Sequence, residues 1–266
     1  ARGVRGVLKV VRHRRWLACV ARDWWSAERA LGLMQPAFGY RNGADSDVID
    51  EALDKALRRG KASRLASAGD PGTFLERDFS LARRYDVAPA VHATLETASA
   101  TARISDGKLE LWVGSQAPES ARRAAADAIG FSERDVVLYP MPAGGSFDRR
   151  LENDHAVEAA IIAHRTGLPV QLTWSRWQEL VAGPARTPVS AVLGARVTQG
   201  GDLAGWYARI AVPPSAREFG RRLFGGETAH AAMAEVAGET DALAMEGALP
   251  PYAIEHLAID QVPAVV

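Results

Sequence analysis

Short apolar runs separated by polar turns open the chain and have the length of β-strands. Residues 7–11 and 16–21 form two such runs on either side of a basic turn, which predicts two strands joined by that turn. Asp23 then stands where a helix cap is expected. From Trp24 onward, apolar residues recur at helical spacing until Pro36 stops the pattern. The opening of the chain therefore predicts a ββα unit.

A second helical pattern covers residues 46–58, whose apolar side chains fall on one face. The residues that follow are small, polar and rich in glycine and proline. Because such residues favour turns and loops, we predict a linker over 60–83 between two domains. The first domain would end at residue 59, and the second would cover 84–266.

Strand and helix patterns alternate beyond this linker. Apolar runs at 101–104 and 109–113 flank Ser-Asp-Gly-Lys, which favours a β-hairpin. We expect an α+β fold of mixed sheets with crossing helices. The remaining elements that the pattern predicts are strands at 135–139, 169–174, 189–199 and 203–212, helices at 119–129 and 150–166, a loosely specified insertion at 220–247 and an extended segment from 250 onward.

Composition narrows the possible functions. Lysine plus arginine and aspartate plus glutamate both number 32, so the formal net charge is zero. Because the chain has no basic excess, we expect no nucleic-acid partner. The one cysteine, Cys19, excludes an internal disulfide and a cysteine-based metal cage. The apolar surroundings of Cys19 predict a small buried side chain. We expect the tryptophans to be core residues as well. No apolar run is long enough to cross a bilayer.

A glycine-containing loop over residues 140–147 is the sharpest local feature. The pair Gly144-Gly145 lets the backbone approach a ligand and turn its N–H groups outward, and Phe147 could add a flat apolar wall. Taken alone, this tetrapeptide is more often an ordinary tight turn. Gln116 follows a predicted strand, and its amide could donate to an anionic or oxo ligand, although such a glutamine is usually just solvated.

Other polar residues give weaker signals. His92 and Glu96 could share a helix face as metal ligands, but an extended or loop conformation fits their segment equally well. Two candidate ligands without a third do not make a metal site. Asp154 and Glu158 lie at helical spacing with Arg150, which predicts ion pairs on the helix surface.

The order of the segments adds information that no single motif carries. The series resembles the molybdenum-binding large subunit of xanthine dehydrogenase/aldehyde oxidase-type hydroxylases. The paired arginines after Phe147, with Leu-Glu-Asn-Asp, are similar to the isoquinoline 1-oxidoreductase branch, in its beta subunit. The opening ββα unit resembles the end of that family's hammerhead domain. The chain thus resembles an internal fragment that continues into the molybdopterin-binding domain. The segments that carry the likeness are 91–102, 106–118, 142–154, 168–176, 185–188 and 249–254.

The resemblance implies roles for particular residues. Gln116 would hydrogen-bond an oxo-type ligand of the molybdenum, and Arg186 would orient the substrate. The implied reaction is hydroxylation of an N-heterocycle or oxidation of an aldehyde, with oxygen derived from water. The loop residues that the resemblance implies at the cofactor are Gly144, Gly145, Ser146 and Phe147.

The same resemblance implies a cofactor and several partners. The cofactor would be molybdopterin with molybdenum, in its cytosine dinucleotide form. A small subunit would carry [2Fe–2S] clusters, and a cytochrome c subunit is a further candidate partner. The remainder of the large subunit, or a second chain, would supply the base glutamate. The branch favours the periplasm over the cytoplasm.

Two departures from the family pattern keep a second hypothesis open. Asp148 replaces the glycine that is usual after the loop phenylalanine, and it puts a carboxylate near an anionic cofactor. The glutamate of the family's Gly-x-Gly-Glu segment has no counterpart in residues 1–266. The alternative is therefore a catalytically incomplete structural module that binds partner subunits without cofactor. A third possibility is a fragment with no independent role.

Overall fold

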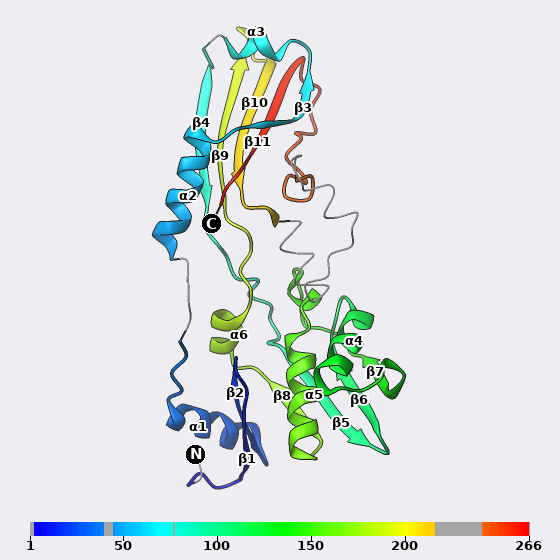
Figure 1. Ribbon diagram of the computed structural model, residues 1–266. Helices are drawn as coiled ribbons and strands as arrows, with labels where there is room; N and C mark the ends of the chain where they lie inside the picture. Colours follow the sequence, from blue (N-terminus) through cyan, green and yellow to red (C-terminus); the bar gives the residue numbers. More distant parts are fainter. Residues whose placement is uncertain (1–2, 40–44, 77, 216–240, 266) are drawn as a thin grey trace. The chain divides into compact units, whose positions relative to one another are not determined.

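The chain forms two compact units. The computed structural model describes residues 3–39, 45–76, 78–215 and 241–265, and Figure 1 shows its elements. Unit 1 consists of Ala1–Arg41 and Val91–Pro184, and unit 2 of Asn42–Ala90 and Ala185–Val266.

The predicted ββα unit opens unit 1. Strand β1 (Val7–Arg12) pairs antiparallel with β2 (Leu17–Ala21), and helix α1 (Trp24–Met34) follows. The Asp23 carboxylate accepts a hydrogen bond from the Ser26 amide at 2.8 Å, so it caps the helix where the sequence predicted.

Four strands make the mixed sheet of unit 1, in the order β7-β6-β5-β8. Strands β5 (Ser99–Ser105) and β6 (Lys108–Val113) form the predicted hairpin. Strand β7 (Val136–Pro140) runs parallel to β6, and β8 (Val170–Thr173) runs antiparallel to β5. The parallel pair needs a crossover, and helix α4 (Pro118–Ile129) provides it.

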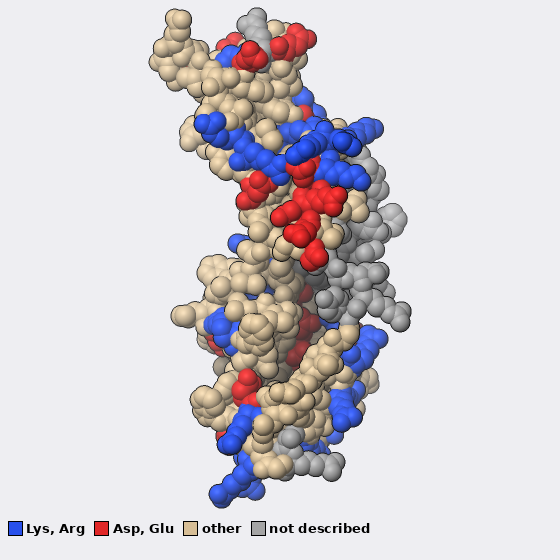
Figure 2. Space-filling model, turned by 90° about the vertical axis from the view of Figure 1, so that its left-hand side faces the viewer, with Lys and Arg blue, Asp and Glu red and all other residues tan. Residues whose placement is uncertain are grey.

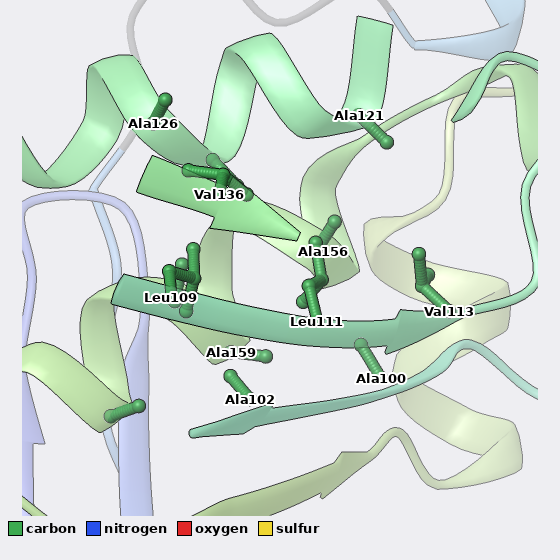
Figure 3. Close-up of a cluster of buried hydrophobic side chains, with 13 residues drawn as sticks. Ala100, Ala102, Leu109, Leu111, Val113, Ala121, Ala126, Val136, Ala156 and Ala159 are labelled. Atoms are coloured by element: carbon green, nitrogen blue, oxygen red, sulfur yellow. The ribbon is translucent and has the colours of Figure 1, made fainter. Parts of the chain in front are cut away.

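Helices α4 and α5 (Asp154–Thr166) pack on this sheet through alanine-rich faces (Figure 3). Small side chains let the helix backbones come close to the strands, and β6 fills the space between with larger residues. Helix α5 begins later than the predicted 150–166, because a short 3₁₀ turn (Arg149–Leu151) precedes it. The buried core residues are Ala100, Ala102, Leu109, Leu111, Val113, Ala121, Ala125, Ala126, Val136, Ala156, Ala159, Ala160 and Ala163.

Unit 2 is built on a five-stranded sheet in the order β3-β11-β10-β9-β4. Strands β10 and β11 are parallel and the other neighbours are antiparallel. Helix α2 (Ser46–Arg59) packs on the sheet through Leu53, Ala56 and Leu57. The strand bounds are β3 Ser63–Ala68, β4 Leu81–Val87, β9 Val189–Val197, β10 Leu203–Val212 and β11 His256–Pro263.

The α+β fold with mixed sheets and crossing helices is confirmed, but two parts of the chain differ from the sequence expectation. The segment 60–83, predicted as a linker, contains β3, helix α3 (Pro71–Leu75) and the start of β4. Strand β3 pairs with β11, whose residues lie far along the chain, so no local pattern reveals it. Helix α6 (Arg176–Ala182) was not predicted. Most of the predicted insertion at 220–247 lies outside the described residues.

Side-chain exposure corrects the prediction for several hydrophobic residues. Trp174 is buried as expected, whereas Trp25 and Trp177 are 76% and 72% exposed. Cys19 is only partly buried. Acidic and basic side chains gather beside each other over α2 (Figure 2). Within the described ranges, no helix is long and apolar enough to cross a membrane.

Candidate functional site

The glycine loop that follows β7 has an unusual backbone. Gly145, Phe147 and Asp148 all have positive φ values, of 96°, 52° and 71°. Glycine adopts such a conformation without cost, but a bulky residue such as phenylalanine rarely does. Strain of this kind costs of order 1–3 kcal/mol and is concentrated at functional sites. Phe147 is 62% exposed, so core packing does not explain the strain.

Three successive amides of this loop are open. The N–H groups of Gly145, Ser146 and Phe147 donate to none of the residues that the structure describes, whereas the Gly144 amide donates to Glu96 Oε2 at 2.6 Å. Consecutive amides in a turn with left-handed residues form a concavity that attracts anions. The loop therefore has the donor set expected of an anion-binding site.

Gln116 and the loop meet through a small hydrogen-bond network. The Ser146 hydroxyl donates to Gln116 Oε1, and the Arg150 amide donates to the same hydroxyl oxygen at 3.1 Å. The backbone N–H of Gln116 in turn donates to the Arg150 carbonyl at 3.0 Å. Since Ser146 binds the oxygen of the Gln116 side chain, the nitrogen of that side chain remains as a donor. The structure thus brings together the predicted residues Gln116, Gly144, Gly145, Ser146 and Phe147.

A buried ion pair lies behind this loop, and sequence reasoning missed it. Arg149 Nε is 3.2 Å from Glu179 Oε1, and the two side chains are 2% and 4% exposed. Glu179 Oε2 also accepts the Ala98 amide at 2.7 Å, and the Arg149 guanidinium lies over the Trp174 ring. Glu179 comes from helix α6, which begins at Ser175 with a capping box. The Ser-x-x-Gln spacing of that box was the signal that could have revealed the helix.

Two titratable groups of helix α5 are largely enclosed. Burial lowers the pKa of His155 to about 4, and the nearby Arg150 adds to the effect, so the ring is neutral at pH 7. Burial raises the pKa of Glu158 to about 7, against a hydrogen bond from Trp174 that lowers it. The prediction of surface pairing between Arg150, Asp154 and Glu158 is wrong. Arg150 is 3% exposed and donates to the Glu96 carbonyl instead.

The remaining candidate residues fall into separate places. Arg186 belongs to unit 2, where its amide donates to the Ala90 carbonyl at 2.7 Å and its side chain is exposed. His92 and Glu96 lie in a loop and not on a helix. No cluster of potential metal ligands occurs in the part of the chain that the structure describes. Asp148 is exposed and left-handed, a conformation that aspartate tolerates better than most residues.

Comparison with known proteins identifies the class of domain. Residues 57–217 match the family model for the molybdopterin cofactor-binding domain. The beta subunit of isoquinoline 1-oxidoreductase from Brevundimonas diminuta is 34% identical over 95 residues, which are 36% of this chain and 12% of that protein. A subunit of nicotinate dehydrogenase from Pseudomonas putida is 24% identical over 258 residues, which are 96% of this chain and 21% of that protein. The chain thus spans a minor part of the length of these relatives.

Solved structures agree with the fold. Aldehyde oxidoreductase from Desulfovibrio desulfuricans aligns with a TM-score of 0.66 and 16% identity, over 99% of this chain and 33% of that one. Quinoline 2-oxidoreductase from Pseudomonas putida 86 aligns with a TM-score of 0.60 and 13% identity, over 92% of this chain and 31% of that one. At such low identities the likeness concerns the fold alone, and it matches the observed mixed sheets.

Proposed function

The chain belongs to the molybdopterin cofactor-binding domain family, and we propose that its glycine loop and Gln116 hold one side of a molybdenum-containing molybdopterin. The observation that carries the proposal is the row of open amides at Gly145, Ser146 and Phe147 beside the Gln116 side chain. This domain would be one segment of the large catalytic subunit of an oxidoreductase.

The donor set fits the proposed cofactor. Molybdopterin carries anionic sulfur and phosphate groups, and the metal carries oxo-type oxygens, all of which accept hydrogen bonds. The backbone amides of the loop and the side-chain amide of Gln116 are neutral hydrogen-bond donors. They can donate to such groups without any change in their protonation state. The Ser146 hydroxyl holds the side-chain oxygen of Gln116, so the NH₂ group of Gln116 would face the ligand. Residues 140–147 include no carboxylate or imidazole that would replace the cofactor's own ligands to the metal.

Each partner in the proposed reaction has a separate role. When bound, the cofactor supplies two-electron redox chemistry, and the protein orients the reactants and tunes the site. Gln116 would hold an oxygen ligand in place, and Phe147 would cover one side of the substrate site. Arg186 would stabilise negative charge that develops on the substrate. The substrate would be an N-heterocycle or an aldehyde, and relatives named after isoquinoline and nicotinate support the heterocycle.

The proposal extends to the partners of the chain. The remainder of the large subunit, or a second chain, would provide the general base, which contributes roughly 10²–10⁴-fold in such reactions. A small subunit with [2Fe–2S] clusters would remove electrons, with a cytochrome c subunit as a further candidate. We favour the cytosine dinucleotide form of the cofactor and a periplasmic location, both by resemblance to the family.

The test compares the intact complex with two glutamine variants. We expect Gln116→Ala to lower hydroxylase activity by tenfold or more, because the variant loses a donor to the metal's oxygen ligand. Gln171→Ala removes an exposed glutamine from β8 of the same unit and should leave the activity unchanged. Equal activity in wild type and Gln116→Ala would contradict the proposed role.

A structural module without cofactor is the second candidate function. The exposed carboxylate of Asp148 favours it, because negative charge on this loop opposes an anionic ligand. Metal and pterin analysis of the native complex distinguishes the two functions. A complete assembly that contains neither molybdenum nor pterin would favour the structural module.

A further inference from the structure

We propose that Glu96 is a positioning residue that fixes the glycine loop and thereby decides which loop amides face the ligand. The inference rests on the proposed function, because it concerns the same loop. Glu96 does not touch the cofactor in this proposal; it acts through Gly144.

Glu96 and Gly144 hold each other by two hydrogen bonds of opposite direction. The Gly144 amide donates to Glu96 Oε2 at 2.6 Å, and the Glu96 amide donates to the Gly144 carbonyl at 3.0 Å. A hydrogen bond to an ionised acceptor is roughly twice as strong as a neutral one. Both polar groups of the Gly144 backbone are therefore satisfied by a single residue that lies far away in the sequence.

Glu96 is itself firmly held, although its side chain is exposed. Its second carboxylate oxygen, Oε1, accepts from the Ser99 hydroxyl at 3.0 Å. Its carbonyl accepts from the Thr94 hydroxyl at 2.7 Å and from the Arg150 guanidinium at 2.8 Å. Arg150 also belongs to the turn that follows the loop, so Glu96 connects the loop's start to its end. Each oxygen of the Glu96 carboxylate and its backbone carbonyl therefore accepts at least one hydrogen bond, so the side chain is held in one position.

The close approach of the two segments explains why position 144 is a glycine. A Cβ atom on Gly144 would lie 2.6 Å from Glu96 Cβ, nearer than real Cβ contacts allow. Gly144 was predicted to contact the cofactor, whereas its amide already serves Glu96. We therefore assign Gly144 to loop geometry, and Gly145, Ser146 and Phe147 to the ligand.

The charge of Glu96 is partly offset by the guanidinium of Arg150, which reduces its repulsion of an anionic ligand. The Arg150 side chain bonds directly to the Glu96 backbone, and it is electrostatically coupled to the Glu96 carboxylate. The carboxylate oxygens also point their lone pairs at Gly144 and Ser99, so they are already engaged.

Three variants separate geometry from charge. Glu96→Gln keeps the length and one acceptor oxygen, so it should retain the bond to the Gly144 amide. Glu96→Ala removes the acceptor, and Glu96→Asp shortens its reach by one methylene. The matched control is Glu110→Ala, which removes another carboxylate of the same unit, one that binds Arg103 and Tyr139 rather than the Gly144 amide.

The readout is residue-resolved hydrogen exchange across 144–148 in the intact complex, together with molybdenum content. In Glu96→Ala and Glu96→Asp we expect the Gly144 amide to exchange about tenfold faster or more, because no side-chain oxygen is left within its reach. Molybdenum content should fall several-fold in both. Glu96→Gln should stay within about threefold of wild type, and so should Glu110→Ala.

Two results would overturn the inference. One is a Gly144 exchange rate in Glu96→Ala that equals the wild-type rate. The other is an equal rise of that rate in Glu96→Gln and in Glu96→Ala. The exchange measurement does not depend on the proposed function: wild-type protein without molybdenum would refute that function and still report on Glu96. If the core strands β5 and β6 of a variant exchange at the same rate as in wild type, general unfolding is excluded as the cause of faster exchange at Gly144.

Discussion

The enclosed carboxyl group of Glu158 should make the stability of unit 1 depend on pH, and Glu158→Gln should abolish its share of that dependence. Burial is the main cause of the raised pKa, and Asp154 adds to it. The Trp174 hydrogen bond, Arg15 and Arg149 act in the opposite direction. The folded protein therefore holds this proton up to about pH 7, whereas the unfolded chain releases it near the ordinary value of 4.5.

The sign and size of this pH dependence follow from the linkage between proton binding and the free energy of unfolding. Below pH 4.5 both states are protonated, and the neutral carboxyl group does not destabilise the fold. Between pH 4.5 and about 7 the unfolded state loses its proton first, so stability falls as the pH rises. A pKa displaced from 4.5 to about 7 corresponds to a loss of about 3 kcal/mol at pH 8. His155 contributes with the opposite sign, because its lowered pKa makes stability rise with pH between about 4 and 6.5.

Comparison of wild type with Glu158→Gln cancels the His155 contribution. Glutamine has the shape of the protonated acid and can still accept from Trp174 Nε1, whose bond to Glu158 is 2.9 Å long. Urea unfolding, followed by tryptophan fluorescence and by hydrogen exchange in unit 1, gives the free energy at each pH. We expect the two proteins to be nearly equal at pH 4.5, and the variant to be more stable by about 3 kcal/mol at pH 8. Glu119→Gln, an exposed carboxylate on α4, is the control. A stability difference between wild type and Glu158→Gln that does not change with pH would show that Glu158 does not titrate with a raised pKa.

Two further predictions concern charges on either side of the loop. Glu179→Ala leaves the Arg149 guanidinium buried without its partner, and urea unfolding should show a loss of about 3–5 kcal/mol. Glu110→Gln, at the more exposed Arg103 pair, should cost at most about 1 kcal/mol; equal losses would contradict the account. Asp148→Gly relieves a left-handed residue, so the same assay should show a gain of about 1 kcal/mol. The Asp148→Gly variant should also bind at least as much molybdenum as wild type. A loss of stability in this variant would contradict the premise that the left-handed conformation strains Asp148.

Local patterns were enough to predict much of unit 1. The cap at Asp23 and the turn at Asp106-Gly107 depend on residues that are neighbours in the sequence. The periodicity of α4 likewise depends only on its own residues. Strand β3 could not be predicted, because its small residues form a strand only when β11 is beside it. The same holds for β4, whose exposed face carries no alternation and whose partner is β9.

The candidate site was predictable in part. The loop glycines and Gln116 stand out by residue type and by resemblance, and the structure brings them together. The residues that support them do not stand out. Glu96 gains its importance from a partner 48 positions away, and Arg149 is buried by a helix that the pattern did not reveal. A carboxylate or guanidinium in a sequence is usually solvated, so burial of this kind emerges only from tertiary packing.

The central claim is that the open amides of the glycine loop bind molybdopterin. Its most direct test is residue-resolved hydrogen exchange of the native complex, compared with the same complex produced in a host unable to synthesise the pterin. We expect the cofactor to protect the amides of Gly145, Ser146 and Phe147 from exchange. The Gly144 amide, already bonded to Glu96, should change little. Identical exchange of all four amides with and without cofactor would contradict the account.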